Sequence, residues 1–425
     1  MKALNAIFLA IVIAGIAERS TASGSIFFTP YAVSTLVAPD GYTPTSYQAI
    51  PSGIAVDNGG NVYFSDVWMS RLIYMLPPGG PLTVIAGNAS TIMDGTNTDA
   101  GFNSPTALAI DMSGNLYVAD TSSSLIRKIT HVGTNWVVTT AGTRTAGGFG
   151  IAGHNDGTNV VGQFDDPEGV AVDQNGVIYV ADTGNRTIRM LVEDGTNWIT
   201  STIAGKAGIS GIADGTNDTA RFEYPEAIAV NAQGILYVVD NYTHVRQIAP
   251  VGTNWVVTTL FVVQNENEAP KNGTNSVTPI AIGNAAGITV DSVGNLFFAS
   301  SYSLQRVTLS GTDWIGTTLA LVNGLPTGIA VDAAGTLYFT DTRNRTITTA
   351  RPALQYAVTN NQFVFSWPTT PPGGYMLQSS TRLGQGAVWS PLTNGIVTSG
   401  VDFTLTNAID TSISEMFFRL ARPPQ

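Results

Sequence analysis

The sequence predicts an all-β protein built from repeats, and three observations lead to this fold class. The 425 residues are 44% hydrophobic but only 12% charged, so the chain can bury a large core. It contains 45 Gly and 21 Pro, residues that turns between short strands require. Close variants of residues 164–190 also occur six times between Pro51 and Ala350, which indicates a repeat architecture.

Each repeat opens with a short apolar strand that ends in Asp or Asn. The copies are GIAVD (53–57), ALAID (107–111), GVAVD (169–173), AIAVN (227–231), GITVD (287–291) and GIAVD (328–332). Their last residues are separated by 54, 62, 58, 60 and 41 positions. Units of about this length with four short strands are typical of propeller blades, so we expect a six-bladed β-propeller.

Three further strands complete each predicted blade. The second strand is apolar and recurs as NVYFSD, NLYVAD, VIYVAD, ILYVVD, NLFFAS and TLYFTD, which fits burial between neighbouring blades. The third strand is a weaker repeat. The fourth follows a Gly-containing turn, as in TNWVVTTAG at 134–142, because Gly and Asn tolerate the positive φ that such turns need.

The sixth repeat lacks a fourth strand, because Pro352 follows Arg351 without a Gly-Thr-Asn-Trp segment. The segment YAVSTLVA at 31–38 aligns with the fourth strand WVVTTAGT, with Tyr31 in the place of Trp136. We therefore expect this N-terminal strand to complete the last blade and to remove a free sheet edge. The competing candidate, YAVT at 356–359, reads better as the start of the next module. The predicted propeller covers residues 25–352.

Residues 354–425 have a different composition and no copy of the blade pattern. Apolar runs separated by Pro, Gly, Asn and Ser predict strands at 363–367, 375–379, 401–405 and 416–420. We interpret this segment as a small β-sandwich-like domain.

The N-terminus is typical of a signal peptide. Lys2 precedes an apolar run from Ala6 to Ala17, and small residues at Ser20 and Ala22 fit cleavage after residue 22. Residues 1–22 are therefore the expected signal, with an uncleaved anchor as the alternative. We expect an exported monomer, extracellular, on the cell surface or periplasmic, without a membrane span once the signal is removed.

Charge and residue types exclude several function classes. The formal net charge of -11 opposes nucleic-acid binding, which depends on clustered cations. The chain has no Cys, so it has no disulfides, thiolate metal sites or Cys nucleophile. It has no G-x-S-x-G, P-loop or H-E-x-x-H motif, which leaves serine hydrolase, nucleotide-binding and zincin functions without support.

The pattern P-x-G-[IV]-A-V-D-x-x-G-N-[LV]-Y-V-A-D-T-x-N-x-x-I-R resembles NHL repeats, which form six-bladed, TolB-like propellers. The resemblance covers about Pro51–Ala350. DGTN at Asp94, Asp156 and Asp214 is similar to the inter-blade connections of bacterial secreted NHL proteins. The resemblance implies either a binding platform, an extracellular sensor or a zinc-dependent lyase, and neighbouring six-bladed folds include calcium-dependent lactonases, so fold alone does not select the function.

Two glutamates are the candidate metal ligands. Glu168 and Glu226 each lie between the Pro and the small residue that open adjacent inner strands, at the predicted mouth of the central channel. Facing carboxylates would hold calcium, or one would act as a base. The alternative is that each is solvated or paired with an arginine. The three histidines, His131, His154 and His244, fall in unrelated positions, which disfavours zinc.

Repeated aspartates are interpreted as structural. We expect those that end second strands to accept N–H bonds from the following loop, and those that end inner strands to stabilise turns. The two sets are Asp66, Asp120, Asp182, Asp240 and Asp341, and Asp57, Asp111, Asp173, Asp291 and Asp332.

The sequence favours a non-catalytic binding or scaffold protein that contacts a protein or a cell-surface glycan. The expected surface carries the long loops Gly87–Pro105, Gly142–Pro167 and Gly205–Pro225, because loops on a rigid ring can vary without disturbing the core. The residues assigned to it are Asp156, Phe164, Arg186, Arg221, Arg343 and Arg345. Phe102, Phe164 and Phe222 would contribute to this surface or act as plugs between blades, and their fixed distance from the following Pro favours the plug. We predict no catalytic residue and no cofactor other than calcium. The alternative function is a metal-dependent lactonase or lyase that uses Glu168 and Glu226.

Overall fold

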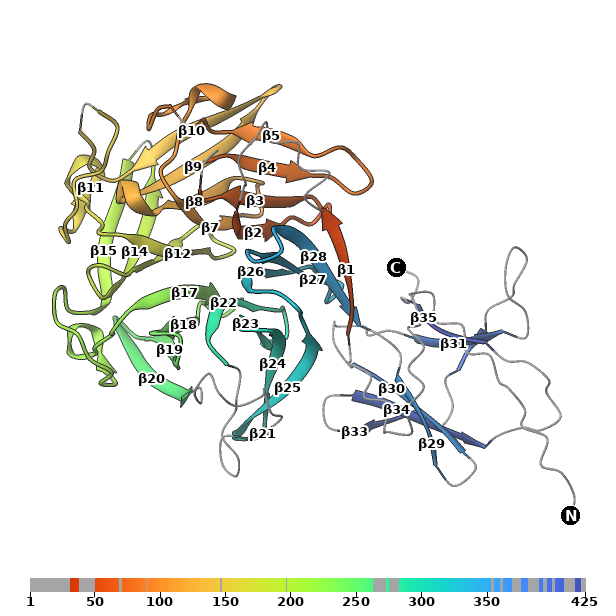
Figure 1. Ribbon diagram of the computed structural model, residues 1–425. Helices are drawn as coiled ribbons and strands as arrows, with labels where there is room; N and C mark the ends of the chain where they lie inside the picture. The colour runs from red at the N-terminus through yellow and green to blue at the C-terminus, as the bar shows by residue number, and fades with distance from the viewer. Residues whose placement is uncertain are drawn as a thin grey trace, which may run out of the picture. The chain divides into compact units, whose positions relative to one another are not determined.

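The computed structural model describes the strands of an all-β protein (Figure 1). The described residues are 31–37, 50–68, 71–88, 90–145, 147–195, 197–262, 273–274 and 283–352, followed by 355–359, 362–368, 376–380, 390–392, 396–399, 402–408 and 417–421. The predicted signal, residues 1–22, lies outside them. Among the described residues, no helix is long and apolar enough to cross a membrane.

Six antiparallel sheets form the blades of a propeller. From the channel outward, the first blade consists of β2 (Pro51–Val56), β3 (Val62–Asp66), β4 (Ile73–Leu76) and β5 (Thr83–Ala86). The second consists of β7 (Pro105–Ile110), β8 (Leu116–Asp120), β9 (Leu125–Val132) and β10 (Asn135–Ala141). The third consists of β12 (Pro167–Val172), β13 (Ile178–Asp182), β14 (Thr187–Asp194) and β15 (Asn197–Gly205). The inner strands contact one another in the cyclic order β2, β7, β12, β17, β22 and β26, and the ring closes from β26 to β2 (Figure 1).

The remaining blades follow the same order. The fourth consists of β17 (Pro225–Val230), β18 (Leu236–Asp240), β19 (His244–Val251) and β20 (Asn254–Val262). The fifth consists of β22 (Ala285–Val290), β23 (Leu296–Ser300), β24 (Ser303–Ser310) and β25 (Asp313–Leu321). The last consists of β26 (Pro326–Val331), β27 (Leu337–Asp341), β28 (Thr346–Pro352) and β1 (Tyr31–Val37). The second strand of every blade is buried at all five positions, because both of its faces lie against neighbouring blades. This accounts for its continuous apolar sequence.

The N-terminal strand completes the last blade, as the sequence predicts. The sheet order is β1-β28-β27-β26, so β1, drawn in red in Figure 1, pairs with β28, drawn in blue. The hydroxyls of Ser34 and Thr349 lie 2.9 Å apart, and Tyr31 is 1% exposed. Closure therefore joins segments 315 residues apart in the sequence.

Two-residue strands cover the outer edges of four blades. They are β6 (Gly95–Thr96), β11 (Gly157–Thr158), β16 (Gly215–Thr216) and β21 (Gly273–Thr274), and they pair with β10, β15, β20 and β25. In the first three, an Asn with positive φ follows, and its side-chain oxygen accepts the N–H of the Trp at the second position of the outer strand. The DGTN loops thus protect edges that would otherwise be free to pair with another chain.

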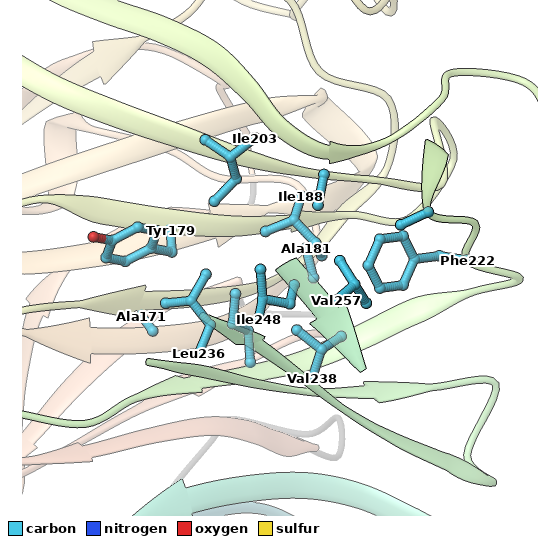
Figure 2. Packing of buried hydrophobic residues seen from close by; sticks show 13 residues of the cluster. Ala171, Tyr179, Ala181, Ile188, Ile203, Phe222, Leu236, Val238, Ile248 and Val257 are labelled. Carbon is cyan, nitrogen blue, oxygen red and sulfur yellow. The ribbon is translucent and has the colours of Figure 1, made fainter. Parts of the chain in front are cut away.

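The core lies between adjacent blades. Figure 2 shows Ala171, Tyr179 and Ile188 of one blade packed against Leu236, Val238, Ile248 and Val257 of the next, and all of them are buried. Phe102, Phe164 and Phe222 have no exposed surface and close the ends of these interfaces, which is the plug role. Burial of these apolar groups is the main force that holds blade to blade.

The C-terminal strands form two antiparallel sheets. The first has the order β29 (Gln355–Thr359), β30 (Gln362–Pro368), β34 (Asp402–Ala408) and β33 (Ile396–Ser399), and the second β32 (Ser390–Pro391), β31 (Met376–Ser380) and β35 (Phe417–Ala421). The four strands predicted from sequence correspond to β30, β31, β34 and β35. Backbone contacts group residues 351–425 apart from residues 33–350.

Candidate functional site

A cavity of about 280 Å³ opens at the end of the channel where the inner strands begin. Each inner strand starts with the same small segment, so equivalent residues of all six blades meet there. The wall is formed by Ser52, Gly53, Thr106, Ala107, Glu168, Gly169, Glu226, Ala227, Ala286, Gly287, Thr327 and Gly328, with Tyr242 from the β18–β19 loop.

Glu168 and Glu226 line this one cavity from adjacent blades. The backbone N–H of Tyr242 donates to Oε2 of Glu226 at 3.2 Å. Among the described residues, no arginine or lysine forms an ion pair with either glutamate. The structure therefore brings the two predicted carboxyls together without a basic partner.

Burial disfavours the charged form of both carboxyls. It raises the pKa of Glu226 to about 8, with a further contribution from the negative charge of Glu168, while hydrogen bonds from Tyr242 oppose the shift. Burial and the charge of Asp166 raise the pKa of Glu168. Burial and the charge of Glu226 also raise the pKa of the Tyr242 hydroxyl. Glu226 thus keeps its proton at neutral pH.

An apolar waist forms the inner end of the cavity. Six aliphatic side chains, one per blade, also line a second cavity of about 180 Å³ further along the channel. Each is between 5% and 7% exposed. We call this set the waist, and it consists of Ile54, Leu108, Val170, Ile228, Ile288 and Ile329.

No group of three or more His, Asp or Glu in the described parts of the chain lies close enough to hold an ion. The histidines belong to separate elements: His131 is on β9 against Trp136, His154 is in an exposed loop, and His244 is on β19 beside Thr243.

The aspartates at the ends of the second strands bind mainly to the loop before the blade. Oδ1 of Asp120 accepts the N–H of Asn103 at 2.6 Å, and Oδ1 of Asp182 accepts that of Asp165 at 2.8 Å. Donors from the following loop reach Asp66 and Asp341. The prediction of a structural role is correct, but the backbone donors to Asp120 and Asp182 come from the preceding loop, because the inter-blade loop packs back over the strand end. The following loop supplies side-chain donors instead, such as Asn185 to Asp182 at 2.8 Å. The turn role of the inner-strand aspartates is confirmed.

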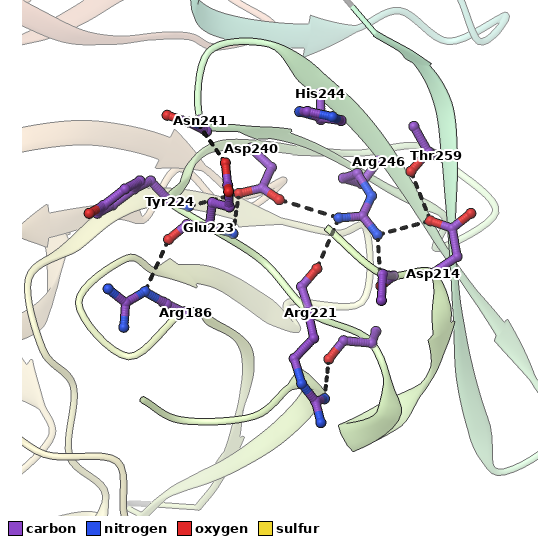
Figure 3. Close-up of polar contacts among 12 residues, drawn as sticks. Arg186, Asp214, Arg221, Glu223, Tyr224, Asp240, Asn241, His244, Arg246 and Thr259 are labelled. Carbon is purple, nitrogen blue, oxygen red and sulfur yellow. Dashed lines mark hydrogen bonds and ion pairs between the residues drawn. The ribbon is translucent and has the colours of Figure 1, made fainter. Parts of the chain in front are cut away.

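Sequence reasoning missed three fully buried arginines that anchor the long loops. Arg246 lies between Asp240, at 3.3 Å, and Asp214 of the DGTN loop, at 2.9 Å (Figure 3). Its guanidinium also donates to two loop carbonyls and lies over the ring of Phe222. Arg127 and Arg189 make the same set of contacts. We call each set an arginine clamp; the signal for it was an Arg at one position of the third strand in only those blades that carry DGTN.

The residues assigned to a binding face have different roles. Phe164 has no exposed surface, so its place in that face is corrected: it is a plug under Arg189. Asp156 belongs to the clamp of Arg189 at 2.8 Å, although half of its side chain is exposed. Arg186 packs over Tyr224, and Arg221 donates to carbonyls of its own loop (Figure 3). Arg343 is exposed and Arg345 half-buried in the β27–β28 loop.

The three long loops form one continuous surface. Arg144 of the second loop pairs with Asp94 of the first at 2.9 Å. Asn185 joins the second loop to the third, because it donates to the carbonyl of Gly153 and accepts the N–H of Gly208. Exposed apolar side chains lie on this surface, and we call them the apolar loop patch: Met93, Phe149, Ile151, Ile209 and Ile212, each between 43% and 48% exposed.

Comparison with known proteins agrees with this architecture. Residues 164–189 match the family model of the NHL repeat. The chain thus contains an NHL repeat within a six-bladed β-propeller. An 87-residue stretch of the chain is 38% identical to NHL repeat-containing protein 2 of Gallus gallus, covering 20% of the chain and 12% of that protein. A 98-residue stretch is 35% identical to the chloroplastic protein SUPPRESSOR OF QUENCHING 1 of Arabidopsis thaliana, covering 23% and 9%. The matches thus span about a tenth of each relative.

Solved structures share the propeller fold of this chain at low identity. A gluconolactonase of Xanthomonas campestris superposes with a TM-score of 0.50 at 15% identity, over 76% of this chain and 89% of that chain. A structural genomics protein of unknown function from Bacteroides thetaiotaomicron gives 0.52 at 15% identity, over 75% of each chain. At such identities the likeness concerns the fold alone.

Proposed function

We propose that this protein is an exported, non-catalytic binding protein whose long loops contact another protein. The observation that carries the proposal is the apolar loop patch, because clustered exposed apolar side chains usually mark an interaction site. The arginine clamps hold the same loops from below, so the patch would bind with little loss of loop entropy. We favour a protein partner over a glycan because the exposed groups are mainly aliphatic.

The experiment places a photo-reactive amino acid at Ile209 of the full chain and exposes the protein to the secreted and envelope fractions of its source. We expect cross-linking to one protein, and binding of that protein to weaken at least about tenfold in Ile209→Asp or Phe149→Asp. Met112, which is 74% exposed in the turn at the far end of an inner strand, provides the matched control Met112→Asp.

Two results would contradict this function. One is that a probe at Met112 captures the same protein as the probe at Ile209. The other is that the captured protein binds the Asp variants as tightly as it binds the wild type. A partner whose binding disappears after glycosidase treatment would replace the protein contact by a glycan contact. Export is tested separately, by N-terminal sequencing of the secreted chain, where a start at Ser23 is expected.

A second candidate function is a metal-dependent lactonase or lyase at the channel mouth. The observation in its favour is that Glu168 and Glu226 line one cavity, and a gluconolactonase shares the fold. Calcium titration by calorimetry on the wild type and on Glu168→Ala tests it. No heat, or the same affinity in both proteins, would rule out the ion site, and absence of lactone hydrolysis would rule out the lactonase.

A further inference from the structure

The cavity at the channel mouth has the size of a small-molecule binding site. Its volume of about 280 Å³ lies near the lower end of the range of about 300–1,000 Å³ that ligand pockets show. A protein segment of several residues does not fit such a space. The cavity shares no residue with the apolar loop patch, so a ligand held here is independent of the contact surface proposed above.

The polar groups of the cavity divide into two kinds. The hydroxyls serve the ring itself: Ser52 Oγ donates to the carbonyl of Thr106, and Thr106 Oγ1 donates to the carbonyl of Glu168. The carboxyl groups of Glu168 and Glu226 are different, because among the described residues only Tyr242 donates to Glu226 and no donor reaches Glu168. Both carboxyl groups are therefore available to a ligand in the cavity.

The inner end of the cavity is apolar. The waist supplies six aliphatic side chains, and Ala286 and Gly287 continue this surface towards the opening. Tyr242, which is 44% exposed, adds an aromatic ring to the same cavity. A ligand with one charged end and an apolar body matches this division, since each part then meets a surface of its own kind.

The charge of the site suits a monocation better than calcium. Calcium takes six to eight oxygen ligands, whereas the described residues place two carboxyl groups here and no third acidic or histidine side chain. Since the raised pKa of Glu226 favours its protonated form at neutral pH, the pair carries less than two negative charges. An oxygen of Glu168 and the carbonyl oxygen of protonated Glu226 would both accept hydrogen bonds from a cation.

We propose that the channel-mouth cavity binds a small organic ammonium ion, with its N–H groups donating to Glu168 and Glu226 and its apolar body resting on the waist. A cation within about 6 Å of an aromatic ring gains a further attraction, which Tyr242 would supply. A neutral molecule of the same shape would lack both interactions.

The test is isothermal titration of the full chain at neutral pH with benzylammonium chloride, benzyl alcohol and calcium chloride. We expect benzylammonium to bind at least about tenfold more tightly than benzyl alcohol. Glu168→Gln removes the charge with little change in shape and should weaken benzylammonium binding about tenfold or more. The matched control is Glu193→Gln, because Glu193 pairs with Lys128 at 2.7 Å outside the cavity.

A second variant blocks the cavity without changing its charge, and its thermal midpoint shows whether the protein still folds. Ala286→Phe places a ring in the cavity wall and should weaken benzylammonium binding while the thermal midpoint stays close to that of the wild type. The proposal is overturned if benzylammonium does not bind the wild type, or if it binds Glu168→Gln and Ala286→Phe as tightly as the wild type. It is also overturned if calcium binds the glutamate pair and benzylammonium does not displace the calcium. Variants of the apolar loop patch, such as Ile209→Asp, leave this binding unchanged, so failure of one proposal is distinguished from failure of the other.

Discussion

At the scale of single residues, the most consequential side chains are the ones that carry charge into buried places. Arg127, Arg189 and Arg246 have no exposed surface, and each pairs with an Asp that has none either. Burial raises the pKa of Asp182 to about 6 although Arg189 and backbone donors oppose the shift, so the carboxylate is still ionised at neutral pH. Such buried ion pairs contribute modestly to the stability of the folded protein when both partners are present. Removal of one partner leaves an unpaired buried charge, which is strongly destabilising.

Arg189→Ala is therefore expected to destabilise the protein by about 3–5 kcal/mol, because Asp182 would stay buried without its cation. The measurement is urea unfolding followed by tryptophan fluorescence. The exposed Arg343 gives the control Arg343→Ala, with an expected change within about 0.5 kcal/mol. Equal effects of the two substitutions would show that the clamp does not hold the loop.

The channel-mouth pair makes stability depend on pH. The pKa of Glu226 is raised from 4.5 to about 8, so its contribution to stability is complete below the unfolded value and is lost as the pH rises through the folded value. Glu226→Gln removes this loss. We expect the variant to be more stable than the wild type by about 1–2 kcal/mol at about pH 9, after allowance for solvent exposure, and about equal at about pH 5. Urea unfolding at both pH values measures the difference in unfolding free energy between Glu226→Gln and the wild type. The control is Glu193→Gln, whose difference from the wild type is subtracted. An identical difference for Glu226→Gln at both pH values contradicts the prediction.

At the scale of elements, β1 and the two-residue edge strands decide how the blades end. β1 supplies the outer strand of the last blade, and β6, β11, β16 and β21 cover the outer strands of four others. Both devices reduce the unpaired backbone that a free sheet edge exposes. The clamped aspartates Asp94, Asp156 and Asp214 directly precede β6, β11 and β16, so edge protection and loop anchoring are coupled in these three segments.

The contribution of β1 is measurable with two residues of the same strand. Tyr31 is 1% exposed, whereas Val33 is 41% exposed. Tyr31→Ala is expected to cost about 3 kcal/mol and Val33→Ala less than about 0.5 kcal/mol, because only the first opens a cavity in the core. Thermal and urea unfolding give both values. Similar small effects would mean that the last blade is stable without its N-terminal strand.

At the scale of the whole molecule, the six inner strands approach one another so closely that small residues are required where they begin. A Cβ added to Gly328 would clash with the carbonyl oxygen of Ser52, at the contact by which the last blade meets the first. The equivalent positions are Gly53, Ala107, Gly169, Ala227 and Gly287. The same close approach sets the width of the cavity at the channel mouth.

Gly328→Ala is expected to destabilise the ring by about 1–3 kcal/mol through overpacking. Gly147 gives the control Gly147→Ala, since a Cβ there would have only an ordinary contact 3.8 Å away. The measurement is the urea midpoint together with the m-value, because partial opening of the ring would lower both. An unchanged midpoint would show that the blades can move apart at this contact without cost.

The sequence by itself determined the blades. Six blades are predicted by the repeated apolar second strands and the turns that begin with Asp, because strand formation and turn geometry depend mainly on neighbouring residues. Closure of the ring is predicted by YAVSTLVA, which takes the place of the missing fourth strand. Position in the repeat also placed Glu168 and Glu226 at one mouth, since equivalent residues of a closed ring lie at the same end.

Only the tertiary structure decided which of these residues are free to act. Phe164 and Phe149 lie in the same loop, yet one is fully buried and the other 47% exposed. Asp156 is held by Arg189, 33 residues away in the sequence, and Tyr242 comes beside Glu226 through a loop between two strands. Exposure, ion pairing and burial of charge depend on which distant segments pack together. That packing is a property of the closed ring, and no local pattern contains it.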